Sequence, residues 1–254
     1  MSNVKVQQVK NTTNKADRRS TVVSPKNHPL ATMMSSFSPS QRAEIEAGMR
    51  KLEERQAEHL RDGKYSNYLN CFPEEARLEP FIEIIPRLSD SQYWSLLRDV
   101  WTTSELIIPD MHTWLDLYQA KRPGREHLMT DGERHALAAM PEVITIWRGC
   151  GYRSAVGGLS WTTDQDRADV FARIACGSRR RLLTGQAGTE PTVAVGTCRR
   201  ADVLAYITGC QESEIVVDPK NVTLVRTYQV PKDSEPDSEQ SNGQIPMGFN
   251  PVLK

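Results

Sequence analysis

The feature that most constrains the fold is a change of hydrophobic period near residue 142. Before it, apolar residues recur three or four positions apart, the spacing that gathers side chains on one face of a helix. After it, short β-branched runs alternate with turn residues, which is typical of strands. Since the strands follow the helices without a regular strand–helix–strand alternation, the sequence predicts an α+β fold and argues against a doubly wound α/β fold.

The first long helix is expected to begin near Ser40 and to end at the Asp62-Gly63 pair. Its apolar residues follow one face, and its many Glu, Lys and Arg residues are assigned to a solvated face. The apolar positions are Ile45, Met49, Leu52 and Leu60.

Two capping boxes indicate where further helices begin. Gln92 follows Ser89 by three positions and Glu133 follows Thr130 by three, so each pair can satisfy backbone N–H groups at a helix start. The second of these helices is expected to end at Pro141, and another helix is expected after Pro109-Asp110. The large residues along these helices are assigned to the core: Tyr93, Leu96, Leu97, Val100, Trp101, Trp114, Leu115 and Tyr118.

The second half is expected to hold five strands and one clear helix. The first strand is predicted to stop at Arg148-Gly149, the helix to be capped by Thr163, and residues 201–207 to form a helical turn. The predicted strands cover 143–147, 158–162, 193–197, 215–217 and 222–228, with a Gly- and Arg-rich loop at 177–190.

Composition excludes several classes of protein. The 254 residues contain no apolar run near the ~18 needed to cross a bilayer, and the first residues lack the apolar region of a signal peptide. The five Cys are irregularly spaced and the five His show no zinc spacing, so neither a disulfide framework nor a metal site is expected. Cys150 is favoured as a buried thiol over a reactive one. A reduced, cytoplasmic setting fits best, with no membrane partner.

The balanced total of 32 basic and 32 acidic residues conceals an uneven distribution. Residues 1–30 carry six Lys or Arg against one acid. We expect residues 1–37 to form a disordered basic arm, either a solubilising tail or a weak nucleic-acid or acidic-partner tether. Residues 231–254 are expected to form a second disordered tail. Between them we expect a helical region at 38–110, which is either a separate domain or a cap, and a catalytic domain at 111–230.

Three polar features flank the predicted strands of the second half. Arg148 follows the first strand, Ser160 lies in the next, and Glu212 and Glu214 open the fourth. Each has an ordinary explanation by itself: a surface arginine, a strand-forming serine, and two solvated acids. Glu212 and Glu214 are two positions apart, so in a strand they point to the same face.

Taken in order, these features resemble the ADP-ribosyltransferase family, in its Arg–Ser–Glu clade. The matching segments are ITIWRG (144–149), GLSWTTDQDRADVFA (158–172) and ESEIVVDP (212–219), and the resemblance covers roughly residues 110–230. It implies a split β-sandwich around an NAD cleft, preceded by helices. It also implies a mono-ADP-ribosyltransferase that takes NAD as its substrate and modifies arginine in a protein target, releasing nicotinamide.

The resemblance assigns a role to each matching residue. Arg148 would bind the phosphate or ribose region of NAD, and the backbone of Gly149 would hold the nicotinamide amide. Ser160, supported by Thr162, would orient NAD and the catalytic acid. Glu214 would be that acid, close to the positive charge that develops as the glycosidic bond breaks. Glu212 would face the acceptor arginine, and residues 206–211 would read the acceptor. Phe171 would pack near the nicotinamide or in the core. The arginines of the loop at 177–190 would assist the pyrophosphate or be solvated: Arg179, Arg180 and Arg181.

Other functions remain open at this point. One is an NAD glycohydrolase or a transferase onto nucleic acid, for which the basic arm would help to bind the acceptor. Another is a non-catalytic binding or structural protein of the same fold. By analogy alone, the layout suggests an intracellular phage or bacterial effector. The sequence determines neither the target nor the oligomeric state.

Overall fold

The computed structural model describes residues 37–104, 110–151, 156–176, 190–209 and 212–231. The chain divides into two compact units, Met1–Lys64 and Tyr65–Lys254. Residues 65–104 therefore share a unit with the strands, whereas from the sequence they were expected to belong with the preceding helix in a region 38–110. The expected tails lie outside the described residues, apart from Phe37 and Pro231, and so does nearly all of the loop expected at 177–190.

In the first unit, one long helix, α2 (Pro39–Arg61), confirms the helix that the periodicity predicted. It begins one residue early because Ser38 and Gln41 form a capping box. At its other end Gly63 has a φ of 67°, a left-handed conformation that costs glycine little. Lys64 N–H then donates to the His59 carbonyl at 2.8 Å, which completes a Schellman motif.

The second unit contains the other helices of the described residues, and both predicted capping boxes form in it. Ser89 and Gln92 cap the start of α5, and Thr130 and Glu133 cap the start of α7. The helices are α3 (Tyr65–Leu69), α4 (Leu78–Ile84), α5 (Asp90–Thr103), α6 (Met111–Tyr118), α7 (Asp131–Ala139) and α8 (Gln165–Cys176). Short 3-10 turns cover Glu74–Ala76, Ile85–Arg87, Arg125–Leu128, Arg200–Asp202 and Pro219–Asn221.

Aromatic side chains form the core between the helices, as the sequence predicted. Trp101 of α5 packs edge-on against Trp114 and Tyr118 of α6, with ring centroids 5.1 Å apart in both pairs. Of the residues assigned to this core, only Leu115 is half-buried; the next apolar residue of α6, Leu117, is buried in addition. Large side chains that are fully buried in this part of the chain include Phe81, Tyr93, Trp94, Leu97, Val100, Trp101, Trp114, Tyr118 and Leu128.

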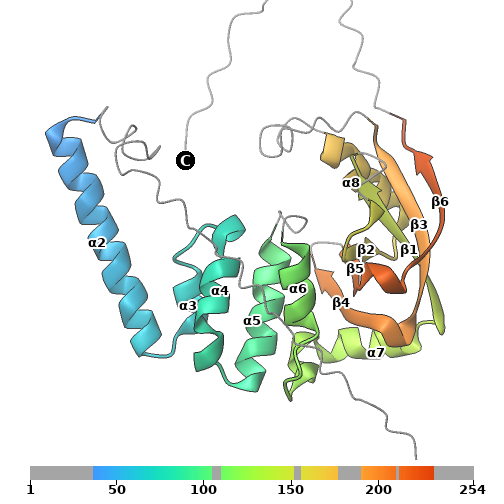
Figure 1. Cartoon of the computed structure of the whole chain (residues 1–254), viewed down its shortest axis with the longest axis horizontal. Coiled ribbons are helices and arrows are strands. Elements are labelled where there is room, and N and C mark those ends of the chain that lie inside the picture. Colours follow the sequence, from blue (N-terminus) through green and yellow to red (C-terminus); the bar gives the residue numbers. More distant parts are fainter. Residues whose placement is uncertain (1–36, 105–109, 152–155, 177–189, 210–211, 232–254) are drawn as a thin grey trace, which may run out of the picture. The chain divides into compact units, whose positions relative to one another are not determined.

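A six-stranded antiparallel sheet fills the rest of the second unit and confirms the general α+β class (Figure 1). Its strand order is β4-β5-β2-β1-β3-β6. One buried cluster joins Ala168 and Ala172 of α8 to Val193 of the sheet. A larger buried cluster includes Ile146, Trp161 and Ile215. The strands are β1 (Val143–Cys150), β2 (Ser160–Thr162), β3 (Thr192–Arg199), β4 (Val203–Gly209), β5 (Glu212–Val217) and β6 (Thr223–Gln229).

Three local predictions for the second half were wrong, one of them only in part. β1 does not stop at Arg148-Gly149, because pairing with β3 continues as far as Cys150 and Thr192. Of the helical turn expected at 201–207, only residues 201–202 lie in a 3-10 turn. Residues 203–209 form strand β4, because they pair with β5 and bury residues 205–207. The cap of α8 is Asp164, not Thr163: Asp164 Oδ1 accepts from the N–H groups of residues 166 and 167 at 2.9 and 3.2 Å.

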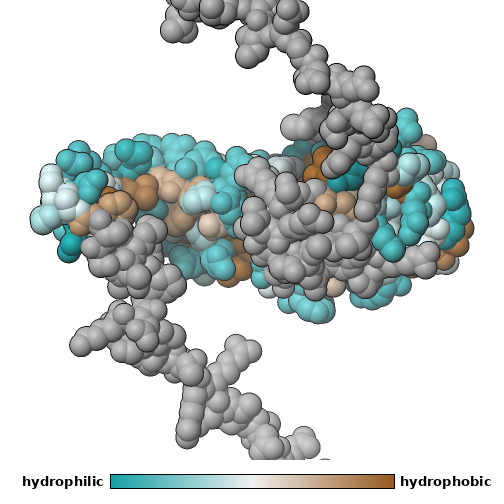
Figure 2. All heavy atoms as spheres, turned by 90° about the horizontal axis from the view of Figure 1, so that it is seen from above, coloured by the Kyte–Doolittle hydropathy of each residue, from teal (hydrophilic) through white to brown (hydrophobic). Residues whose placement is uncertain are grey.

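The surface of the described residues is mixed in polarity. Figure 2 shows hydrophobic residues interspersed with hydrophilic ones on the visible face. The large exposed apolar residues of the second unit include Ile82, Val143, Val170, Ile174, Leu224 and Val225. Among the described helices, none has both the length and the apolar character that a bilayer crossing requires.

Candidate active site

The register of strands β2 and β5 places four of the predicted site residues on one face of the sheet. Thr162 of β2 lies directly opposite Glu214 of β5. Directly opposed residues share a face, and so do residues two apart in a strand. Ser160 and Glu212 therefore lie on the same face as this pair. The intervening Trp161 points to the other face, where it is buried in the core.

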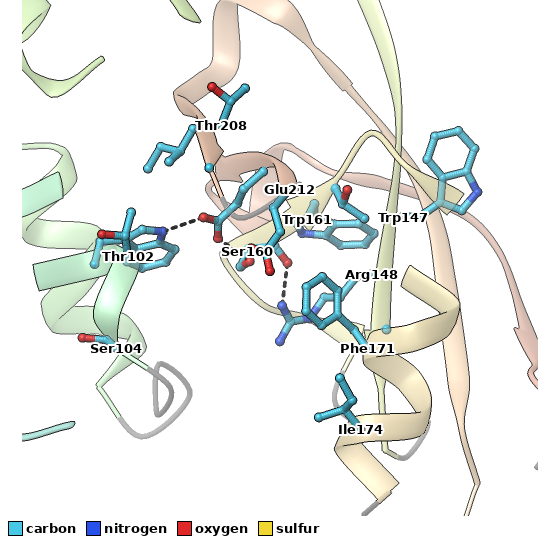
Figure 3. A pocket seen from close by; sticks show the side chains of 16 residues that line it. Thr102, Ser104, Trp147, Arg148, Ser160, Trp161, Phe171, Ile174, Thr208 and Glu212 are labelled. Carbon is cyan, nitrogen blue, oxygen red and sulfur yellow. Dashed lines mark hydrogen bonds between the residues drawn. The ribbon is translucent and has the colours of Figure 1, made fainter. Parts of the chain in front are cut away.

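Hydrogen bonds connect Arg148, Ser160 and Glu214, which come from three adjacent strands. Ser160 Oγ donates to Glu214 Oε1 at 2.5 Å. Arg148 Nη1 donates to the carbonyl oxygen of Ser160, also at 2.5 Å. These bonds are drawn in Figure 3. A short polar chain thus runs from β1 through β2 to β5.

Two glycines make this arrangement sterically possible. A Cβ atom on Gly158 would lie 2.3 Å from Cζ of Arg148, so only glycine leaves room for the guanidinium there. A Cβ atom on Gly149 would lie 2.2 Å from the carbonyl oxygen of Ala168, so Gly149 lets helix α8 pack closely on β1. This packing accounts for the missing side chain at Gly149, and its role toward nicotinamide remains a prediction.

Helix α8 adds an aromatic side chain and a cation to the site. Phe171 is half-buried and lines the pocket. The guanidinium of Arg167 lies 5.5 Å from the centre of the Phe171 ring. Its Nη2 atom also lies 3.4 Å from Glu212 Oε1, with both side chains about one-third exposed. The predicted acceptor carboxylate therefore already has a guanidinium beside it.

These side chains surround a pocket of about 360 Å³, a volume within the usual range for small-molecule sites. All seven site residues named from the sequence line it: Arg148, Gly149, Ser160, Thr162, Phe171, Glu212 and Glu214. In Figure 3, Thr102 of α5 and Ser104, which follows the end of α5, lie on the opposite side of the site from Phe171 and Ile174 of α8. The expected acceptor-reading segment 206–211 contributes Ile207, Thr208 and Gly209 to the lining; residues 210–211 lie outside the described residues, as do Arg179, Arg180 and Arg181.

Helix α5 contributes to the site in a way that the sequence pattern did not indicate. Trp101 was assigned only to the core, yet its Nε1 atom donates to Glu214 Oε2 at 3.0 Å. Thr102 and Ser104 also line the pocket. The one available signal was that a buried indole N–H usually finds an acceptor. That rule does not identify an acceptor 113 positions away along the chain.

The surroundings of Glu214 raise its pKa. Burial is the largest cause, because it disfavours the charged carboxylate, and the negative charge of Glu212 acts in the same direction. The hydrogen bonds from Ser160 and Trp101 and the charge of Arg148 oppose the rise only in part. Glu214 is thus a carboxylate whose charge is poorly compensated, which favours interaction with a cation.

A second carboxylate, Glu133 of α7, supports one wall of the pocket. It is 2% exposed and accepts two bonds from Arg98 of α5, at 2.6 and 2.8 Å. It also accepts from the backbone N–H of Thr208 at 2.6 Å and from that of Thr130 at 2.8 Å. Burial alone would raise its pKa, but these bonds outweigh burial and lower the pKa to about 2. Glu133 therefore joins α5, α7 and the pocket-lining end of β4.

Comparison with known proteins adds no relative to this picture. No family model, no curated protein and no solved structure matches the chain.

Proposed function

We propose that the chain is a mono-ADP-ribosyltransferase, which transfers ADP-ribose from NAD to an arginine of a protein and releases nicotinamide. We further propose that its sheet is a split β-sandwich of the ADP-ribosyltransferase type. One observation carries the proposal: Arg148, Ser160 and Glu214, from three separate segments, are hydrogen-bonded together in a single pocket. Had these residues lain far apart, the resemblance would have had no chemical meaning.

The state of Glu214 suits cleavage of the nicotinamide–ribose bond. As that bond breaks, positive charge develops on the ribose, and a nearby carboxylate stabilises the transition state. Burial of Glu214 strengthens this interaction because little water screens it. The bond from Ser160 fixes one carboxylate oxygen, so less reorganisation is needed during the reaction.

The pyrophosphate of a dinucleotide needs a cation and its flat nicotinamide ring needs an apolar surface, and the pocket offers both. Arg148 is suited to phosphate because its guanidinium presents several donors in a planar fork. Phe171 provides an aromatic face for a flat ring such as nicotinamide. The pairing of Arg148 with the Ser160 carbonyl keeps the cation next to the residue that orients Glu214.

The contact between Glu212 and Arg167 supports arginine as the acceptor. An acceptor arginine must bring a guanidinium close to Glu212, and a guanidinium is already accommodated there. Carboxylates pair well with guanidinium groups and can accept the proton released as the new C–N bond forms. We therefore assign Glu212 to binding and activation of the acceptor.

Incubation of the protein with labelled NAD and a cell lysate tests the catalytic assignment. Glu214→Gln should reduce both label transfer and nicotinamide release at least about a hundredfold, since it removes the charge that stabilises the transition state. Glu142→Gln is a matched control because Glu142 is exposed and does not line the pocket. Unchanged labelling by Glu214→Gln would refute the assignment.

A second variant separates transfer from simple hydrolysis. Glu212→Gln should abolish transfer to arginine but preserve some nicotinamide release. In hydrolysis the acceptor is water, which has no guanidinium for Glu212 to bind. Equal loss of both reactions would contradict an acceptor-specific role for Glu212. If the unmutated protein releases nicotinamide without labelling any protein, it is an NAD glycohydrolase.

A further inference from the structure

Helix α5 reaches the candidate catalytic acid through a single hydrogen bond. Trp101, in the last turns of α5, donates from Nε1 to Glu214 Oε2 at 3.0 Å. The other oxygen, Oε1, receives the bond from Ser160. The two carboxylate oxygens are therefore held by residues of different parts of the unit, one in a helix and one in the sheet.

The indole that makes this bond is itself firmly held. Trp101 is 2% exposed, and its ring packs edge-on against Trp114 and Tyr118. Edge-on aromatic packing fixes the direction of a ring as well as its position. The N–H of Trp101 is consequently a preorganised donor, aimed at Glu214 by the packing of α5 on α6.

We propose that Trp101 is a positioning residue for Glu214: its N–H orients the carboxylate within the pocket and favours its charged form. The catalytic consequence rests on the proposed function, whereas the physical coupling of the two side chains does not. This role is additional to the Arg, Ser and Glu residues identified from the sequence, and it makes helix α5 part of the reaction site.

The chemistry of the two donors explains why Trp101 is needed beside Ser160. A serine hydroxyl can rotate and can accept a bond as readily as donate one, so it also tolerates the protonated acid. An indole N–H can only donate, and it therefore favours the carboxylate over the carboxylic acid. Each carboxylate oxygen has two acceptor positions. With one used on each oxygen, a substrate hydroxyl can still bind Glu214.

Several charged and titratable groups besides Trp101 influence Glu214. Arg148 of β1 favours its charged form, and Glu212 of β5 disfavours it. Tyr118 of α6 is fully buried, with a pKa well above the usual value because of burial and of the charge on Glu214. It therefore stays neutral through the pH range of the test. Within that range, loss of the Trp101 bond should act on Glu214 directly.

The chain provides a matched control in Trp114. It belongs to the same aromatic cluster and is 1% exposed, but its Nε1 atom has no hydrogen-bond partner among the described residues. Trp101→Phe and Trp114→Phe thus remove similar buried surface, and only the first removes a bond to Glu214. A difference in behaviour between the two variants therefore measures the effect of the hydrogen bond from Trp101 to Glu214.

The first measurement is the pH profile of NAD cleavage, as kcat and KM. A hydrogen bond to a carboxylate is strong enough to change its pKa by about one unit. Trp101→Phe should therefore move the acid limb of the kcat profile about one unit toward higher pH. At pH values below the midpoint of that limb, kcat should fall about tenfold. Trp114→Phe should leave the limb in place. Equal profiles for the two variants, or a loss without displacement of the limb, would refute the proposal.

The second measurement needs neither catalysis nor a stable Trp101 variant. In protein labelled with ¹⁵N at its five indoles, the Trp101 N–H resonance should titrate with Glu214, at a pKa above that of a free glutamate. Glu214→Gln should abolish this titration, and the Trp114 resonance should stay nearly constant. If no indole resonance responds to Glu214, Trp101 does not hold it. If one responds while NAD is not cleaved, the coupling stands and the proposed function fails.

Discussion

Replacement of Glu133 by glutamine should destabilise the protein most strongly near neutral pH. The carboxylate lies buried against Arg98, and its pKa is lowered from 4.5 to about 2. At 1.36 kcal/mol per pKa unit, that difference corresponds to about 3 kcal/mol of folding free energy. A similar value, about 3–5 kcal/mol, is typical of breaking a buried ion pair by removing one partner.

The sign of the pH dependence follows from the lowered pKa. The stabilisation by Glu133 is fully present above pH 5, where the carboxylate is charged in both the folded and the unfolded chain. Below pH 5 the unfolded chain takes up the proton first, so the stabilisation diminishes as the pH falls toward 2. The gap in stability between the unmutated protein and Glu133→Gln should therefore narrow over this range.

Urea denaturation of both proteins at a series of pH values from 7 to 3 measures this gap. Glu126→Gln is a suitable control, since Glu126 is an exposed residue seven positions earlier in the chain. A gap below about 1 kcal/mol at pH 7, or one that stays constant down to pH 3, would refute the reasoning. The result bears on function as well, because Glu133 also binds the backbone of pocket-lining Thr208.

Three further predictions concern the pocket. Glu214→Gln should raise the thermal midpoint of unfolding. A carboxylate with a raised pKa destabilises the fold increasingly as the pH rises above 4.5, and an amide does not. An unchanged or lower midpoint at pH 7 would argue against a raised pKa for Glu214. Gly158→Ala should raise the KM for NAD about tenfold, because the added methyl group would displace the guanidinium of Arg148. An unaltered KM would show that Arg148 does not hold NAD. Arg167→Gln should lower the KM for an arginine acceptor by no more than about fivefold, since an ion pair with Glu212 that is about one-third exposed is weak. A rise in KM would mean that Arg167 helps to bind the acceptor.

The sequence by itself determined the features that depend on near neighbours. The capping boxes at Ser89 and Thr130 formed as predicted because each involves a side chain and a backbone group only three residues apart. The aromatic stripes of α5 and α6 became core because one face of a helix must be buried. The motif order also singled out seven residues that line one pocket, although their roles remain predictions.

Pairing between strands decided what local patterns could not. Residues 203–209 contain helix-forming Leu and Ala, yet they form β4 because pairing with β5 and burial override weak local preference. The end of β1 was misplaced for the same reason, since β3 extends the pairing beyond Arg148. Only the strand order β5-β2-β1 brings Glu214, Ser160 and Arg148 within hydrogen-bonding distance.

The tertiary structure alone revealed the part played by helix α5. Trp101 has the pattern of an ordinary core residue, and it is one. Its N–H reaches Glu214 only because α5 packs beside the sheet, across 113 positions of sequence. Periodicity shows that a side chain is buried, but not which polar atom it meets there, because that depends on the packing of distant segments.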